Sequence, residues 1–224
     1  FYAAFTEYLG FSAYDGEYKV MGLAAYGRFN KEIKGKISQV IFPAKDGIGY
    51  NLDPTYIHYG SHSYSNRFTD KLVDLLGRSP RLPDEEVDDW HKALAFAVQE
   101  QLEESVNRLV TWAIFKTGVS NVCVSGGVGH NVKMNSSIFN LPEVKNIFPH
   151  PLCGDSGAAI GAALAGCYKL KGILPEKLKT VSLGFQESNV SIEEAFQVSK
   201  IKYERHQDIC QATAKELADG RIVA

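Results

Sequence analysis

The sequence predicts an α/β fold with a mostly parallel sheet, and two neighbouring segments carry this prediction. In the first, an apolar strand at residues 122–125 runs into a glycine turn at residues 126–131. In the second, a strand at residues 144–148 is followed by a glycine-rich turn that starts at Gly154. A helical pattern follows each turn. Because parallel strands end at one edge of a sheet, we expect a single ligand cleft there.

Composition excludes several classes of protein. The chain has 224 residues, of which 45% are hydrophobic and 22% charged, with a formal net charge of −2 and no basic stripe. A nucleic-acid surface is therefore not expected. The longest uncharged apolar run, residues 157–168, is shorter than the roughly 20 residues that span a bilayer. With no signal-peptide pattern, we expect a cytoplasmic protein that does not insert into a membrane.

Cysteine spacing and the chain ends give two further expectations. No two cysteines form a CxxC pair, and Cys123 and Cys167 lie in apolar patterns, so we expect them to be reduced core residues. The chain begins at Phe1 without methionine and stops at Ala224 where a strand pattern opens. We expect an excised part of a larger protein, which could bury an exposed apolar face in a homodimer.

Helices dominate the part before the first glycine turn. The longest helical signal is residues 85–116, where apolar side chains repeat at i+4 over roughly 40 Å and predict packing across the sheet. Residues 44–65 lack a helical period and predict short strands and turns. The other helices of this part are expected at residues 1–9, 17–26, 31–42 and 68–76.

One helix is expected after each glycine turn, and the sequence pattern changes beyond the second of these helices. A helix over residues 131–139 follows the first turn, and a helix over residues 156–170 repeats small residues that allow close approach to a neighbour or a ligand. A domain boundary is expected near Thr180. Beyond it we expect a helix that starts near Ser191, a strand at residues 202–204 and a helix at residues 208–219.

The first glycine turn is compatible with two readings. It is neither a GxGxxG fingerprint nor a Walker A loop. A strand that ends in glycines and opens a helix gathers unpaired N–H groups that suit a phosphate. The same residues also make an ordinary tight turn, and the motif alone favours neither reading.

Three charged residues are candidates beside these turns. Asp155 could cap the following helix, or it could hold a divalent metal or orient a phosphate. A carboxylate that faces a phosphate is repelled unless a cation lies between them, which motivates the metal hypothesis. Glu17 and Lys19 lie two residues apart, so on a helix they point in different directions and suit separate contacts or plain exposure to solvent.

Four motifs occur in an order that resembles the NodU/CmcH family of O-carbamoyltransferases. They are FYAAFTEYLGF at residues 1–11, GEYKVMGLA with a following Tyr26-Gly27, GGVGHN at 126–131 and GDSGAAIGAA at 154–163. The resemblance covers most of residues 1–170, and Ser182-Leu183-Gly184 resembles the start of the family's C-terminal domain. His130 departs from the usual small or aliphatic residue.

The resemblance implies a fold and a division into domains. The expected fold is part of the actin-like ATPase (ribonuclease H-like) superfold with a short α+β C-terminal extension. Residues 1–180 would form the C-terminal half of the actin-like carbamoyltransferase domain. Residues 181–224 would form a linker and the beginning of a YrdC-like domain.

The resemblance also implies chemistry. The family makes carbamoyl adenylate from carbamoyl phosphate and ATP, then transfers the carbamoyl group to a hydroxyl of a sugar, an antibiotic or another small molecule. A divalent metal, expected to be iron, takes part, and Asp155 would be the catalytic, metal-binding residue. The residues implied for nucleotide binding are Glu17, Lys19, Gly126, Gly127, Val128, Asn131, Gly154 and Gly157.

Parts of the family's site are missing from this chain. Its metal-binding histidines and its arginine-rich carbamoyl phosphate site lie outside residues 1–224, so the isolated chain is expected to be inactive. Two alternatives use the same turns: a sugar kinase or other ATPase of the actin-like superfold, and a catalytically inactive nucleotide-binding module.

Overall fold

The computed structural model describes residues 1–58, 66–173, 180–182 and 184–223. It divides into two compact units, Phe1–Lys177 and Leu178–Ala224. The predicted boundary near Thr180 adjoins residues 174–179, which lie outside the described residues. The assignment of the two units to an actin-like half and a YrdC-like start stays a prediction.

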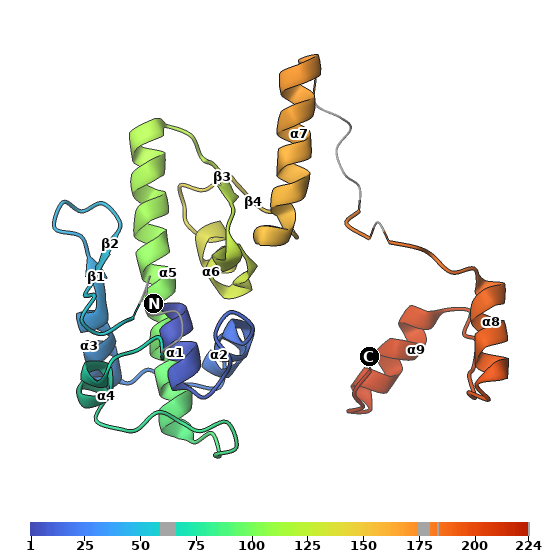
Figure 1. The fold of residues 1–224 in the computed structure, drawn as a ribbon, viewed down its shortest axis with the longest axis horizontal. Helices are drawn as coiled ribbons and strands as arrows, with labels where there is room; N and C mark the ends of the chain where they lie inside the picture. Colours follow the sequence, from blue (N-terminus) through green and yellow to red (C-terminus); the bar gives the residue numbers. More distant parts are fainter. Residues whose placement is uncertain (59–65, 174–179, 183, 224) are drawn as a thin grey trace. The chain divides into compact units, whose positions relative to one another are not determined.

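The long helix α5 (Asp89–Thr117) organises the first unit, and Figure 1 shows it in green with α1, α2, α3 and α6 beside it. It begins four residues later than predicted, because the Asp88 side chain accepts the backbone N–H of His91 and caps the helix there. It ends at Gly118, whose φ of 70° is the left-handed conformation that glycine adopts readily.

The remaining predicted helices of this unit are present. The one over residues 31–42 is shorter than expected, because residues 41–43 join a strand. The elements are the helices α1 (Tyr2–Tyr8), α2 (Glu17–Ala24), α3 (Lys31–Val40), α4 (Asp70–Leu76), α6 (Val132–Phe139) and α7 (Ala158–Lys171), the 3-10 turns η2 (Gly127–His130) and η3 (Asp155–Gly157), and the strands β1 (Ile41–Pro43), β2 (Tyr50–Leu52), β3 (Asn121–Val124) and β4 (Asn146–Pro149).

Two small sheets lie among these helices. Strands β3 and β4 pair in parallel with Cys123 opposite Phe148, as the two strand–turn–helix patterns predicted. Strands β1 and β2 form an antiparallel pair, with Ile41 opposite Leu52. The α/β class is therefore confirmed, whereas the actin-like arrangement stays a prediction, since a two-stranded parallel sheet does not define it.

Two clusters of buried side chains form the core of this unit. The larger cluster joins α1, α3, α4 and the first half of α5. The smaller is centred on Leu102, Met134 and Ile138, and Val106 of α5 and Val122 of β3 each pack against it. The apolar stripe of the long helix is therefore buried mainly against the helices α2, α3 and α6, and its packing across the parallel sheet stays a prediction.

The expectation that Cys123 and Cys167 are core residues is wrong. Cys123 is exposed on β3 and Cys167 of α7 is only half-buried, whereas Cys153 is buried. For Cys167 the reason is that α7 buries none of its residues within this unit. An apolar sequence pattern predicts burial only where another element covers it.

The second unit contains α8 (Asn189–Val198) and α9 (Ile209–Ala218), capped by the side chains of Ser188 and Asp208. The strand expected at residues 202–204 is not formed, so the described residues of this extension are helical rather than α+β. A strand needs a ladder partner, and here Tyr203 instead packs its ring on Phe196, with centroids 5.1 Å apart. Leu183 of the resemblance lies outside the described residues.

Among the residues that the structure describes, no helix combines the length and hydropathy needed to cross a bilayer.

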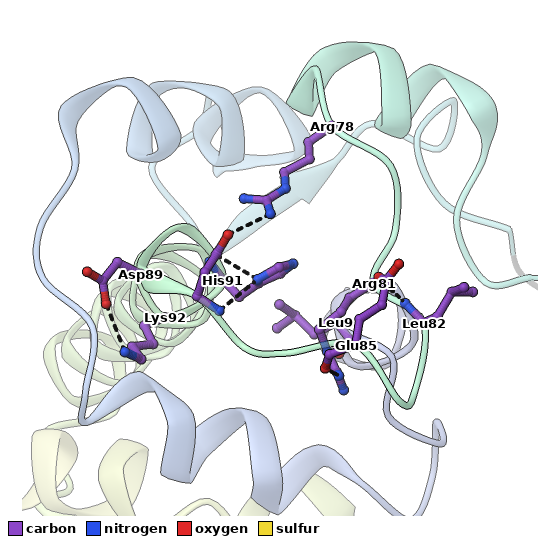
Figure 2. Close-up of polar contacts among 9 residues, drawn as sticks. Leu9, Arg78, Arg81, Leu82, Glu85, Asp89, His91 and Lys92 are labelled. Carbon is purple, nitrogen blue, oxygen red and sulfur yellow. Dashed lines mark hydrogen bonds and ion pairs between the residues drawn. The ribbon is translucent and has the colours of Figure 1, made fainter.

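A network of charged side chains fixes the start of α5 (Figure 2). Arg78 donates to the Asp88 carboxylate at 2.6 Å. Close by, Arg81 is almost fully buried and donates to the backbone carbonyls of Leu9, Pro83 and Glu85. These bonds satisfy the Arg81 guanidinium and tie the loop after α4 to the end of α1.

Stability is expected to fall with acid because of Asp88 and His91. Partial burial disfavours the Asp88 carboxylate, but hydrogen bonds from Arg78 and the His91 backbone outweigh burial and lower the pKa of Asp88 to about 2. Burial lowers the pKa of the His91 imidazole. Both folded pKa values lie below the unfolded values of about 3.9 and 6.5, so the unfolded chain binds more protons in acid.

The Tm of the full-length protein should therefore decline as pH falls below about 6.5, first through His91 and, below about pH 4, through Asp88. Replacing His91 with Gln should remove the first part of this decline. A Tm series from pH 8 to pH 4 measures it. The same profile in both proteins would contradict the assignment to His91.

Candidate functional site

A cleft of about 660 Å³ lies where the two glycine turns face α1, α2 and α5. It combines aromatic and apolar side chains with carboxylates and the first turn. Its lining residues are Tyr2, Ala3, Tyr14, Asp15, Glu17, Tyr18, Met21, Leu102, Gly127, Val128, His130, Asn131 and Asp155. Mostly apolar clefts with a few convergent polar groups are the usual form of small-molecule sites.

The parallel pair brings the two turns together. Strands β3 and β4 end at the same edge, with Val124 opposite Pro149. The backbone N–H of Gly126, the first residue of the first turn, donates to the Cys153 carbonyl at 2.7 Å. Gly126 has φ +99°, a conformation that favours glycine. The predicted single cleft at the strand ends is thus built from both turns.

The glycines of the turns serve different purposes. A Cβ added to Gly157 would lie 1.9 Å from the Leu152 carbonyl oxygen, so Gly157 is required for packing of the second turn. A Cβ on Gly127 would meet no atom within 4 Å, because this glycine borders the cleft. Gly126, Gly154 and Gly157 shape the turns without lining the cleft, and their proposed nucleotide contacts stay predictions.

Asp155 lines the cleft and does not act as the helix cap that the sequence also allowed. The helices η3 and α7 start after Gly154 and Gly157, and neither start is capped by a side chain. His130 lies on the neighbouring turn and lines the same cleft, with its Nε2 close to Gly154. The Asp155 carboxylate is therefore available to a ligand.

Glu17 and Lys19 diverge, as their spacing predicted. Glu17 lines the cleft, and its Oε1 accepts the backbone N–H of Tyr14 at 2.8 Å. Lys19 is outside the lining, with its Nζ 5.8 Å from the ring centroids of Phe11 and Tyr18. The structure thus brings Glu17, but not Lys19, to the glycine turn.

Asn131 is anchored from behind by Gln99 of α5, a residue that the sequence analysis missed. Asn131 and Gln99 exchange two side-chain hydrogen bonds, at 2.9 and 3.0 Å. The Asn131 Oδ1 also accepts the N–H of Met134 at 2.9 Å and caps α6. Both residues are buried. Asn131 therefore fixes the first turn to the helix behind it while it lines the cleft.

Tyr2 extends this network across the cleft. Burial raises the pKa of the Tyr2 hydroxyl, which stays protonated and donates to Gln99 Oε1 at 2.7 Å. The Gln99 Nε2 also donates to Glu103 at 2.8 Å. Gln99 thus links α1, α5 and the start of α6. No sequence motif marks Gln99, because its hydrogen-bond partners lie far away along the chain and nothing in the neighbouring residues indicates them.

The residues that the structure describes do not form a complete metal site by themselves. Among the described residues, no group of three or more His, Cys, Asp or Glu side chains is placed to hold a metal. Asp155 lines the cleft and could supply one ligand. The metal stays a prediction.

A family model and several known proteins that are similar to this chain point to the same family. The family model described as carbamoyltransferase N-terminus matches residues 1–164. The uncharacterized protein sll1178 of Synechocystis sp. is 30% identical over 99% of this chain and 37% of its own length. Nodulation protein NolNO of Sinorhizobium fredii is 29% identical over 99% of this chain and 31% of its own length.

A third relative has the same extent of match. Nodulation protein NolO of Bradyrhizobium diazoefficiens is 27% identical over 100% of this chain and 38% of its own length. The chain spans about a third of the length of these relatives. The match of the family model over residues 1–164 confirms the resemblance carried by the four motifs, and this chain belongs to the carbamoyltransferase family of NodU-like proteins.

Proposed function

We propose that this chain forms one wall of the site at which a full-length O-carbamoyltransferase transfers a carbamoyl group from carbamoyl adenylate to a hydroxyl of a small molecule. The observation that carries the proposal is the cleft itself. The cleft brings together a glycine turn, Glu17 and the carboxylate of Asp155, which does not cap a helix, in a member of the carbamoyltransferase family.

The first turn would hold the phosphate of the adenylate. The N–H groups of Gly127 and Val128 open η2, where first-turn N–H groups have no acceptor within the helix. Val128 and Gly127 border the cleft, so these donors would meet an anion there. Asn131 keeps the turn in place through Gln99.

Asp155 would act at the reacting end. In the transfer step the acceptor oxygen forms a bond to the carbamoyl carbon, the bond from that carbon to the phosphate oxygen breaks, and AMP leaves. The hydroxyl proton must be removed, and the Asp155 carboxylate, which lines the cleft, would accept it. A divalent metal, for which Asp155 would be one ligand, supplies charge neutralisation when bound.

The rest of the proposed enzyme lies outside this site. Residues 1–180 would belong to the actin-like half, and residues 181–224 would lead into a YrdC-like domain that makes the adenylate from carbamoyl phosphate and ATP. The acceptor would be a sugar, an antibiotic or another polyol, in the cytoplasm.

The products formed from ATP test this function. The full-length protein should release pyrophosphate from ATP only when carbamoyl phosphate is present, and AMP should form as the adenylate passes its carbamoyl group to an acceptor or to water. A sugar kinase of the same superfold would form ADP and would not need carbamoyl phosphate. Separation of labelled nucleotides after incubation with and without carbamoyl phosphate distinguishes the two. Formation of ADP alone would contradict the proposal.

A further inference from the structure

One residue of the cleft has a strained backbone. Tyr14, in the loop between α1 and α2, has φ +70°. Among the described residues, Lys200 is the other non-glycine residue with positive φ. A bulky residue in the left-handed region is uncommon and costs energy that the surroundings must offset. Such outliers gather at ligand-binding positions.

Contacts from two other elements hold Tyr14 in this conformation. Its backbone N–H is fixed by Glu17 Oε1 at 2.8 Å. The Arg67 guanidinium lies over its ring, 4.3 Å from the centroid. Arg67 is itself anchored by Glu7 of α1, which accepts the Arg67 backbone N–H at 2.5 Å and the Nη1 at 3.2 Å.

Burial of the ring does not explain the strain. Tyr14 is 78% exposed although it lines the cleft beside Tyr2 and Tyr18. A residue that only had to make this turn would be Gly or Asn, both of which adopt positive φ at lower cost. With Arg67 over one ring face, the surface that remains open can receive a second flat group.

We propose that Tyr14 is a ligand-stacking residue that holds the base of the bound adenylate, with Arg67 supporting the ring from its other face. This inference rests on the proposed adenylate site. A base has a π-face that stacks on an aromatic ring, and the Arg67 cation holds that ring in place. The first glycine turn would hold the phosphate, and Tyr14 would hold the base.

Two ligands that differ in the base test this assignment. Replacing Tyr14 with Asn, which tolerates positive φ, should weaken binding of AMP to the full-length protein about tenfold. Binding of ribose 5-phosphate, which lacks the base, should be unchanged. Replacing Tyr14 with Phe should retain AMP affinity. The same Tyr-to-Asn change at Tyr50, an exposed residue of β2, is the matched control and should affect neither ligand.

Calorimetric titration of each variant, together with its Tm, measures these effects. A Tm that is unchanged or raised in the Asn variant, with AMP affinity lost, supports a ligand-binding role. Equal losses of affinity for AMP and ribose 5-phosphate, or no loss of affinity for either, would overturn the role of Tyr14 and leave the adenylate site unaffected. No binding of AMP by the unaltered protein would overturn both this inference and the adenylate site.

Discussion

Replacing Asp155 with Asn in the full-length protein is expected to abolish carbamoyl transfer while synthesis of carbamoyl adenylate continues. The substitution keeps the size of the side chain and removes its charge. Because neither η3 nor α7 depends on a side-chain cap, the second turn should stay folded. Loss of a positioned acid or base reduces a rate by about 100-fold or more.

The two half-reactions can be followed separately. Pyrophosphate release reports adenylate synthesis, and carbamoylated acceptor reports transfer. Replacing Asp74, an exposed carboxylate on α4, with Asn is the charge-matched control and should change neither rate. Equal loss of both half-reactions in the Asp155 variant, or loss of neither, would contradict the role of Asp155 in transfer.

Replacing Gln99 with Leu is expected to weaken AMP binding and to lower stability together. Leu fills a similar volume but leaves the Tyr2 hydroxyl and the Asn131 amide without their buried partners. Each stranded polar group costs roughly 1–3 kcal/mol. Freed from Gln99, Asn131 should no longer hold the first turn in one conformation, so the affinity for the phosphate falls.

Gln101 provides the matched control on the same helix. It is buried like Gln99 but donates to the Ile41 carbonyl of β1, away from the cleft. Replacing Gln101 with Leu should lower the Tm and leave AMP affinity unchanged. If both Leu variants lost affinity in proportion to their loss of stability, the specific link from Gln99 to the first turn would be refuted.

Local sequence signals predicted the scaffold of the cleft well. The i+4 stripe of α5 and the two strand–turn–helix patterns predicted the long helix and the parallel pair, because both depend on periodicity and glycine alone. The two turns were expected to form one cleft, and the Gly126–Cys153 hydrogen bond joins them.

Residues whose role depends on distant partners could not be found in this way. Gln99 lies 32 positions from Asn131, and Arg67 lies far from Tyr14 along the chain. The left-handed conformation of Tyr14 has no sequence signal, since tyrosine rarely adopts it. The strand expected at residues 202–204 failed for a related reason: the described residues of the second unit offer it no partner strand.

A crystal structure of the full-length protein with AMP bound would show whether the nucleotide occupies the cleft between the two glycine turns and α2. We expect the AMP phosphate to lie within hydrogen-bonding distance of the N–H groups of Gly127 and Val128, with Asp155 beside the position of the carbamoyl group. AMP bound only in a separate domain, with the cleft between the two glycine turns and α2 free of nucleotide, would contradict this expectation.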